Sequence, residues 1–270
     1  MNPMTVSNLK VLIRSGGELA SATACRLAES HFRIIMTEVP RPEAVRRKVS
    51  FCEVVYDRVK HVEGKTCRLV TNTAEILDCW AKRELALIVD PSASIKETIS
   101  PDVVVDAVMA KRNIGTCISD APLVIGLGIG FAAGKDVHVV IETNRGHDLG
   151  RVIREGIAEP DTGHPGIIAG YGKERVFRAP KDGLFRTVKN IGDLVTPGDI
   201  VAYVDNEPVS VVIPGIIRGL LRDGSPTTKG MKAGDVDPRA RLDYCESVSD
   251  KGRAIAGGVL EAILAHYNRE

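Results

Sequence analysis

The chain has 270 residues, enough for one large domain or two modest ones. Its 36 basic and 35 acidic side chains nearly cancel, so no overall field would attract nucleic acid or an acidic membrane surface. The apolar runs are too short and too often interrupted to span a bilayer. Six scattered cysteines without a C-x-x-C pair, and an N-terminus without a secretory signal pattern, predict a cytoplasmic protein with reduced thiols.

The first half alternates strand and helix patterns. A short apolar run at 10–14 is followed by two glycines, by helical spacing over 19–31 and by a second apolar run at 32–38. Further Val/Ile/Leu runs occur at 85–89, 103–105, 123–127 and 137–141. Such uninterrupted runs are typical of strands that are covered on both faces. Residues 1–160 are therefore predicted to form an α/β domain, a Rossmann-like doubly wound parallel sheet that binds a nucleotide or cofactor.

Residues 161–245 are predicted to form a second domain, because the chain repeats itself there at an offset of 32 residues. The repeated positions are Gly183, Arg186, Gly192, Thr196 and Gly198, which recur as Gly215, Arg218, Gly224, Thr228 and Gly230. Turns duplicated at a fixed spacing indicate two similar β-units that bury one shared core. The remainder, 246–270, is predicted to contain a helix over 250–267, capped by Ser249 or Asp250 and packed on the first domain. Its Gly257-Gly258 pair indicates a close approach of another backbone or a ligand.

The duplicated segment resembles the barrel-sandwich hybrid domains of the biotinyl/lipoyl class. Carriers of that class hold a modified lysine at the hairpin tip that joins the two halves. Here the joining segment 204–209 has no lysine, and none occurs between Lys189 and Lys229. The resemblance therefore implies a small all-β domain without biotin or lipoate, which would serve as a docking or lid module.

The first glycine turn is a candidate phosphate site. Ser15, Gly16, Gly17 and Glu18 stand where dinucleotide-binding folds place a glycine-rich turn at a helix N-terminus. Glu38 ends the second strand, 21 residues after Gly17, at the spacing of the acid that holds a ribose hydroxyl. The alternative is a tight turn with a surface glutamate.

Two further groups could contribute to the same site. Arg46 and Arg47, with Arg41 and Lys48 beside them, could clamp a second phosphate or form a solvated basic segment. A second glycine-rich stretch follows the strand at 123–127, and it would either admit a ligand at the end of that strand or pack tightly for steric reasons. Its glycines are Gly126, Gly128 and Gly130.

The densest polar cluster follows the strand at 137–141 and consists of Glu142, Asn144, Arg145, His147 and Asp148. We expect it to bind a polar ligand, with Arg145 pairing an anion, or else to form a buried structural network. The adjacent side chains of His147 and Asp148 diverge and do not by themselves make a metal site. His138, Glu142 and His164 offer an alternative metal-ligand set, but no metal site is predicted. Most cysteines are expected to be small core residues.

Several longer strings resemble the YqeB-type accessory proteins of the selenium-dependent molybdenum hydroxylase system. They are V-L-I-R-S-G-G-E-L-A at 11–20, M-T-E-V-P at 36–40, R-R-K-V-S-F at 46–51, V-D-A at 105–107, E-T-N-R-G-H-D-L-G-R at 142–151, K-A-G-D-V-D-P-R at 232–239 and S-D-K-G-R-A-I-A-G-G-V-L-E at 249–261. The N-terminal turn also resembles the Rossmann part of xanthine dehydrogenase accessory factors.

This resemblance implies a maturation protein, more a handler of cofactor than an enzyme. It would bind a molybdenum pterin cofactor or an NAD-like dinucleotide, and its partners would be the hydroxylase apoenzyme or other maturation proteins, with a homo-oligomer left open. The first alternative is an NAD(P)-dependent oxidoreductase, with Glu38 on the ribose and the 142–148 cluster as acid and base. The second is a selenium or sulfur transferase that works through a cysteine such as Cys117.

Overall fold

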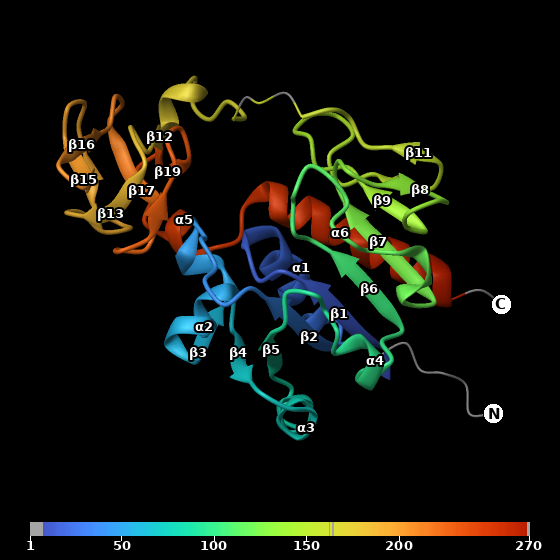
Figure 1. Cartoon of the computed structure of the whole chain (residues 1–270). Helices are drawn as coiled ribbons and strands as arrows, with labels where there is room; N and C mark the ends of the chain where they lie inside the picture. Colours follow the sequence, from blue (N-terminus) through green and yellow to red (C-terminus); the bar gives the residue numbers. More distant parts are fainter. Residues whose placement is uncertain (1–7, 162, 164, 269–270) are drawn as a thin grey trace. The chain divides into compact units, whose positions relative to one another are not determined.

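The computed structural model describes residues 8–161, 163 and 165–268, and it consists of two compact units (Figure 1). The first unit comprises Met1–Pro42, Phe51–Asp161 and Val248–Glu270, and the second comprises Glu43–Ser50 and Thr162–Ser247. The short segment Glu43–Ser50 thus leaves the N-terminal half of the sequence and joins the second unit.

A nine-stranded sheet forms the centre of the first unit, in the order β10-β9-β7-β6-β1-β2-β5-β4-β3. Its strands are β1 (Lys10–Arg14), β2 (Arg33–Glu38), β3 (Val59–Val62), β4 (Lys65–Val70), β5 (Leu85–Val89), β6 (Val103–Asp106), β7 (Leu123–Leu127), β9 (Val139–Ile141) and β10 (Val152–Ile153). From β9 to β4 neighbouring strands are parallel, and β6, β7 and β9 are buried along their whole length. A small antiparallel pair, β8 (Ala132–Ala133) and β11 (Gly156–Ile157), lies beside this sheet.

The prediction of a doubly wound parallel sheet is wrong, because the sheet is mixed. Both edge strands, β3 and β10, run antiparallel to their neighbours. β3 and β4 form a hairpin whose two turn residues, Glu63 and Gly64, have φ values of 49° and 74°. The connection from β6 to β7 contains only a single 3-10 turn, and that from β7 to β9 contains β8, so no crossover helices cover this side in the doubly wound manner.

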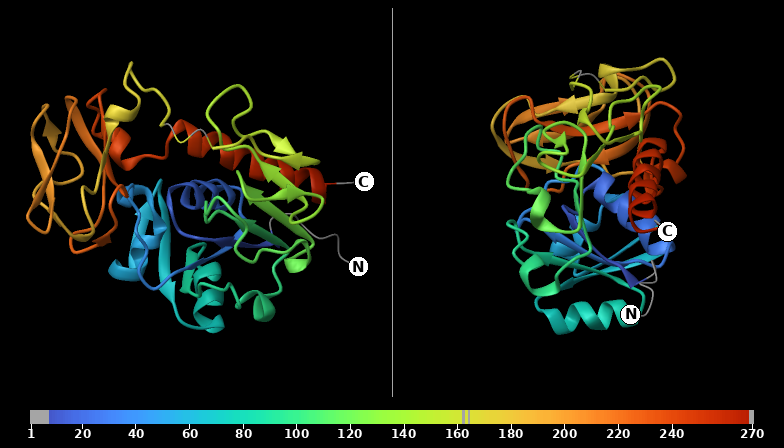
Figure 2. Two further views of the ribbon diagram at one scale, coloured as in Figure 1. Left: turned by 45° about the horizontal axis from the view of Figure 1, so that its top comes forward. Right: turned by 90° about the vertical axis from the view of Figure 1, so that its right-hand side faces the viewer.

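Helices cover both faces of the sheet. α1 (Glu18–Glu29) and α6 (Asp250–Tyr267) lie side by side on one face, and α3 (Thr73–Ala81) lies on the other (Figure 2). The shorter helical turns are η2 (Arg47–Val49), η3 (Phe51–Glu53), α2 (Val54–Asp57), α4 (Lys96–Ile99), η4 (Ile118–Asp120), η5 (Lys173–Arg175) and α5 (Asp243–Glu246).

The predicted helix over 250–267 is confirmed, and so is its cap. The Ser249 hydroxyl accepts a hydrogen bond from the Gly252 N–H at 3.2 Å. A Cβ built on Gly252 would lie 2.9 Å from the Cβ of Ala22, which brings the beginnings of α1 and α6 close together. At the other end of α6, the Tyr267 hydroxyl donates to the Asp102 carbonyl oxygen, just before β6. Both helices therefore run from the carboxyl edge of the parallel strands to the amino edge.

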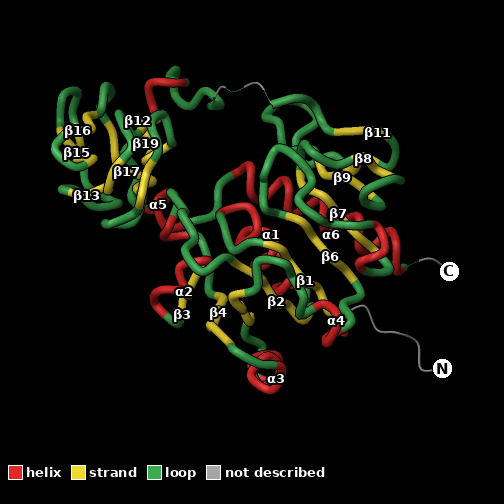
Figure 3. Tube along the Cα trace, in the orientation of Figure 1, coloured by secondary structure: helices red, strands yellow, loops and turns green. Residues whose placement is uncertain are grey.

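The second unit contains two four-stranded antiparallel sheets, in the orders β12-β19-β17-β14 and β16-β15-β13-β18 (Figure 3). Their strands are β12 (Val176–Arg178), β13 (Gly183–Thr187), β14 (Leu194–Val195), β15 (Ile200–Val204), β16 (Glu207–Ser210), β17 (Gly215–Leu220), β18 (Pro226–Thr227) and β19 (Lys232–Asp237). No helix of the described chain combines the length and apolar character that a membrane crossing would need.

The strand pattern of the second unit follows the sequence repeat. β13, β14 and β15 begin 32 residues before β17, β18 and β19. The two repeats exchange strands, since β14 pairs with β17 and β18 pairs with β13. Phe185 and its counterpart Ile217 are fully buried in the same core. Neither repeat could cover this core alone.

The prediction of a barrel-sandwich hybrid of the biotinyl/lipoyl type is nevertheless wrong. The unit is not a contiguous module, because it includes Glu43–Ser50 from the other half of the sequence. The Val45 carbonyl oxygen of that segment accepts a hydrogen bond from the Leu220 N–H of β17 at 2.8 Å, and Val45 packs against the core. The chain is therefore a mixed α/β protein whose second unit consists of two antiparallel sheets.

Candidate functional site

The predicted site residues of the first unit gather at the carboxyl edge of the parallel strands. Open α/β sheets bind ligands at this edge, where neighbouring connections leave in opposite directions. Here that point lies between β1 and β6, because β1 has β2 on one side and β6 on the other. Three segments lie at strand ends on this edge. They are the glycine turn at 15–18 after β1, the glycine-rich stretch at 126–130 at the end of β7, and the polar loop at 142–148 after β9.

A buried ion pair, with further hydrogen bonds to its carboxylate, lies at the carboxyl ends of β1 and β6. Arg14 Nη1 lies 2.9 Å from Asp106 Oδ2, and the two residues are only 5% and 1% exposed. The Thr116 hydroxyl donates to the same carboxylate at 2.5 Å and accepts from Arg14. Val108 N–H donates to the other carboxylate oxygen at 3.0 Å. Sequence reasoning missed these residues, although each strand is an apolar run that ends in one charged residue.

The glycine turn is held closed by Glu38. One Glu38 carboxylate oxygen accepts from the Gly16 N–H and the other from the Val39 N–H, both at 2.7 Å. Burial raises the pKa of Glu38, and these hydrogen bonds oppose that shift. Ser15 adopts a left-handed φ of 89°, and its hydroxyl accepts from the Gly17 N–H at 3.1 Å. Glu38 thus caps the turn, and its binding of a ribose hydroxyl stays a prediction.

The two glycines of the turn differ in the space around them. A Cβ on Gly16 would lie 2.6 Å from the backbone nitrogen of Cys52, so the turn packs directly against η3. A Cβ on Gly17 would meet only the Ser15 hydroxyl, at 3.5 Å. Space for a ligand at this turn therefore lies on the side of Gly17 and of the N-terminus of α1.

The predicted basic clamp belongs to the second unit. Arg46 donates to the carbonyl oxygens of Tyr244 at 3.0 Å and Ser247 at 3.2 Å. Arg47 Nε donates to the Leu220 carbonyl oxygen at 2.7 Å, and Lys48 pairs with Glu246. These side chains anchor Glu43–Ser50 within the second unit.

Close packing requires the glycines at the end of β7 and directly after it. A Cβ on Gly126 would lie 2.5 Å from the Phe131 ring, and one on Gly128 would lie 2.4 Å from the Thr143 hydroxyl. A Cβ on Gly130 would lie 2.8 Å from backbone atoms of Arg112. These contacts favour the alternative that the glycines allow tight packing and do not admit a ligand. The same packing brings the loops after β6 and β9 together.

Glu142 and Asn144 organise the base of the polar loop. Glu142 is 2% exposed, and its carboxylate accepts from the backbone N–H groups of Thr143 at 2.7 Å, Asn144 at 2.6 Å and Glu159 at 2.7 Å. The Asn144 amide donates to the Glu159 carboxylate at 2.6 Å. A buried carboxylate with three backbone donors shapes the loop, as the network alternative expected. Beside it lies a cavity of about 590 Å³ that also includes Asp148.

The remaining side chains of the loop point to different partners. Arg145 makes a two-pronged ion pair with Asp250 of α6, at 2.7 and 2.9 Å. Asp148 pairs with Arg151 at 3.2 Å, and His147 is exposed. Within the described residues no three His, Cys, Asp or Glu side chains come together in a way that could hold a metal ion. His164, a third candidate ligand, lies outside the described residues.

Lys251, which sequence reasoning did not single out, lies among these groups. It is half-buried in the first turn of α6, and its ammonium group forms no hydrogen bond or ion pair with another described residue. Burial lowers its pKa, as does the charge of Arg145, while the carboxylates of Glu18, Asp161 and Glu142 act in the opposite direction. The pattern that could have revealed it is a lysine two residues after the helix cap Ser249, in the helix that packs on α1.

Of the six cysteines, Cys117 alone is exposed and the other five are buried, which confirms the expectation that most are core residues. The Cys117 N–H donates to the Asp120 carboxylate at 2.9 Å. Burial raises the pKa of the Cys25 thiol to about 12.

No protein-family model matches the chain. Solved structures with some similarity include the ectoine utilization protein EutE (DoeB) from Ruegeria pomeroyi, at 11% identity and a TM-score of 0.25, with 85% of each chain covered. A succinylglutamatedesuccinylase/aspartoacylase from Rhodobacter sphaeroides gives 14% identity and a TM-score of 0.26, again with 85% of each chain covered. At such low TM-scores neither structure assigns an activity to this chain.

The expectation of a maturation protein for a selenium-dependent molybdenum hydroxylase is wrong. The comparisons with family models and with curated proteins give this role no support. The contacts of three predicted site residues also argue against this role. Arg46 and Arg47 are committed to carbonyl oxygens, and Glu38 is committed to the turn that would have to receive a phosphate.

The curated relative is the "Uncharacterized protein YqeB" of Escherichia coli K12. It is 46% identical over 254 residues, which make up 94% of this chain and 47% of the relative. The chain thus spans about half the length of the relative that it matches. The sequence resemblance to YqeB is confirmed in this form: nearly the whole chain is similar to a stretch that makes up about half of a YqeB protein.

Proposed function

We propose that the first unit binds a small molecule with a phosphate or carboxylate group at the carboxyl edge of its sheet. The observation that carries the proposal is Lys251, a half-buried lysine without a partner among the described residues, beside the glycine turn. A buried ammonium group loses much of its hydration, and an anionic ligand would compensate for that loss.

The helices add to this preference. α1 and α6 run in the same direction and begin side by side, so the positive ends of two helix dipoles meet at this edge. The N-terminus of α1 is preceded by Gly17 and has no side-chain cap, which leaves amide donors for a ligand. The Arg145–Asp250 ion pair holds the polar loop next to Lys251.

The ligand class can be tested by thermal denaturation with inorganic phosphate, citrate, ADP and NAD⁺ at constant ionic strength. We expect at least one of these anions to raise the melting temperature in a saturable manner. A response to inorganic phosphate alone would identify the phosphate group as sufficient, and a tighter response to ADP or NAD⁺ would identify a nucleotide. Lys251→Gln should weaken the response by about tenfold or more, because it removes a charge-assisted contact.

Lys135→Gln is the matched control, because Lys135 is an exposed lysine of the same unit that lies in the turn after β8. It removes the same charge and should leave the response unchanged. The proposal fails if none of the four anions stabilises the protein, or if Lys251→Gln and Lys135→Gln respond like the wild type.

A further inference from the structure

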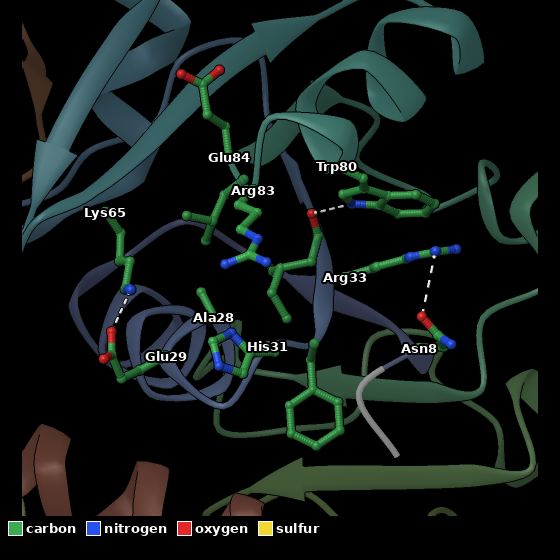
Figure 4. A pocket seen from close by; sticks show the side chains of 12 residues that line it. Asn8, Ala28, Glu29, His31, Arg33, Lys65, Trp80, Arg83 and Glu84 are labelled. Atoms are coloured by element: carbon green, nitrogen blue, oxygen red, sulfur yellow. Dashed lines mark hydrogen bonds and ion pairs between the residues drawn. The ribbon is translucent and has the colours of Figure 1, made fainter. Parts of the chain in front are cut away.

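A second cavity lies at the opposite, amino edge of the same sheet (Figure 4). Its volume is about 470 Å³, within the range of small-molecule sites. It is bordered by the end of α1, the end of α3 and the first residues of β2, β4 and β5. None of the residues discussed for the carboxyl edge contributes to it.

Four basic side chains line this cavity: His31, Arg33, Lys65 and Arg83. Lys65 pairs with Glu29, and Arg33 has a long contact of 3.5 Å with Asn8. The backbone N–H groups of His31 and Arg83 donate to Ala28 and Trp80, but within the described part of the chain their side chains have no hydrogen-bond or ion-pair partner. Figure 4 shows their side chains approaching the same space, while the Glu84 carboxylate is directed away from it, toward its partner Arg68. The Arg83 guanidinium and the His31 imidazole therefore face one volume.

The backbone holds both residues in unusual conformations. His31 follows the end of α1 with a φ of 67°, and Arg83 follows the end of α3 with a φ of 57°. Glycine is the residue that fits such left-handed positions without strain. Strained backbone that carries a functional side chain occurs often at binding sites. An arginine and a histidine at these positions are therefore a second sign of a site.

The opposite wall of the cavity is aromatic and apolar. The Trp80 indole N–H donates to the Ile34 carbonyl oxygen at 2.9 Å, which fixes the orientation of the ring. Phe32 and Leu85, both buried, also line the cavity and add apolar surface. A flat ring could stack here while an anionic group reaches the basic side chains.

We propose that this cavity binds a small organic anion with one ring system and one phosphate or carboxylate group. The anionic group lies between Arg83 and His31, and the ring lies against Trp80. The ligand needs both a ring and an anionic group, because the basic side chains and Trp80 line the same cavity.

Trp80 is the only tryptophan of the chain, so its fluorescence reports directly on this cavity. We would titrate the full chain with adenosine 5′-monophosphate, with 4-hydroxybenzoate and with inorganic phosphate. At least one of the two ring-bearing anions should change the fluorescence in a saturable manner. Inorganic phosphate should bind at least about tenfold more weakly than that ligand. Arg83→Gln should weaken binding of the ring-bearing anion by about tenfold or more.

Lys82→Gln is the control, because Lys82 is the exposed neighbour of Arg83 and does not line the cavity. It removes a neighbouring charge outside the cavity and should bind the ligand like the wild type. Failure of both ring-bearing anions to bind overturns the proposal, as does equal binding of inorganic phosphate. If Arg83→Gln lowers only the melting temperature, Arg83 serves the helix end and the proposal is also overturned.

Discussion

Gly258 of α6 lies against the carbonyl oxygen of Gly150: a Cβ built on Gly258 would stand 2.1 Å from that oxygen. The approach is mutual, since a Cβ on Gly150 would stand 2.6 Å from the Ala254 carbonyl oxygen. The backbone of the polar loop therefore rests on a groove in α6 that only glycine leaves open. This is the close backbone approach that the glycine pair in the sequence indicated.

The first prediction compares the two glycines of that pair. Gly258→Ala should destabilise the protein by about 1–3 kcal/mol, because backbone atoms must move to admit the methyl group. Gly257→Ala is the control. No atom outside the helix lies within 4 Å of a Cβ there, so alanine should raise stability by up to about 1 kcal/mol through its helix propensity. Urea denaturation followed by circular dichroism measures both. Equal effects of the two substitutions would contradict the packing described here.

The second prediction uses the 32-residue repeat as its own control. Arg218 is 9% exposed and lies 3.2 Å from Asp235 and 3.4 Å from Asp237, whereas its counterpart Arg186 is exposed and pairs with Asp223. Arg218→Ala should cost about 3 kcal/mol, because it leaves buried carboxylates with less compensation. Arg186→Ala should cost less than about 1 kcal/mol. Calorimetry would record the unfolding transition of the second unit. Similar losses of stability in the two variants would disprove the difference between Arg218 and Arg186.

The third prediction concerns pH. The Val124 N–H donates to Nδ1 of His138 at 2.9 Å, so this ring nitrogen must stay unprotonated. Burial lowers the pKa of His138, and the charge of His266 adds to the effect. Because the folded state then binds fewer protons than the unfolded state, stability should fall as the pH drops below the unfolded value of about 6.5.

His138→Asn tests this assignment, because its side-chain oxygen can accept a hydrogen bond but does not titrate. Stability curves of the variant should be flatter than those of the wild type between pH 6.5 and the lower folded pKa. His266 is present in both proteins, so the difference isolates His138. Parallel curves would show that His138 does not contribute to the pH dependence of stability.

The fourth prediction concerns the thiols. Maleimide should label the native protein once, at Cys117, because the other five cysteines are buried. Intact mass should show six adducts after unfolding and none in native Cys117→Ser. Rapid native labelling at a second cysteine would contradict the burial of that residue.

The sequence predicts best those features that depend on neighbours along the chain. The helix over 250–267 has a cap, an apolar stripe and a clear end, and β1, β6 and β7 each contain three consecutive Val, Leu or Ile residues. The hairpin of β3 and β4 went unrecognised because lysine, histidine and arginine interrupt its apolar pattern.

The site was predictable only in part, because its contacts join distant segments. The turn, Glu38 and Glu142 were found as polar or glycine-rich residues at strand ends. Their partners were not: Arg14 and Asp106 are separated by 92 positions, and Arg145 and Asp250 by 105. No local pattern shows which group occupies a carboxylate, so the capping role of Glu38 required the structure.

The membership of Glu43–Ser50 in the second unit has a practical consequence for anyone who wishes to divide this protein. The chain passes from one unit to the other after Pro42, Ser50, Asp161 and Ser247, so no single cut separates them. A fragment that contains only 162–247 would lack Val45 and would leave the Leu220 amide without its acceptor. A chimaera of two related proteins made with one crossover between Ser50 and Thr162 would take Glu43–Ser50 from one protein and the rest of the second unit from the other.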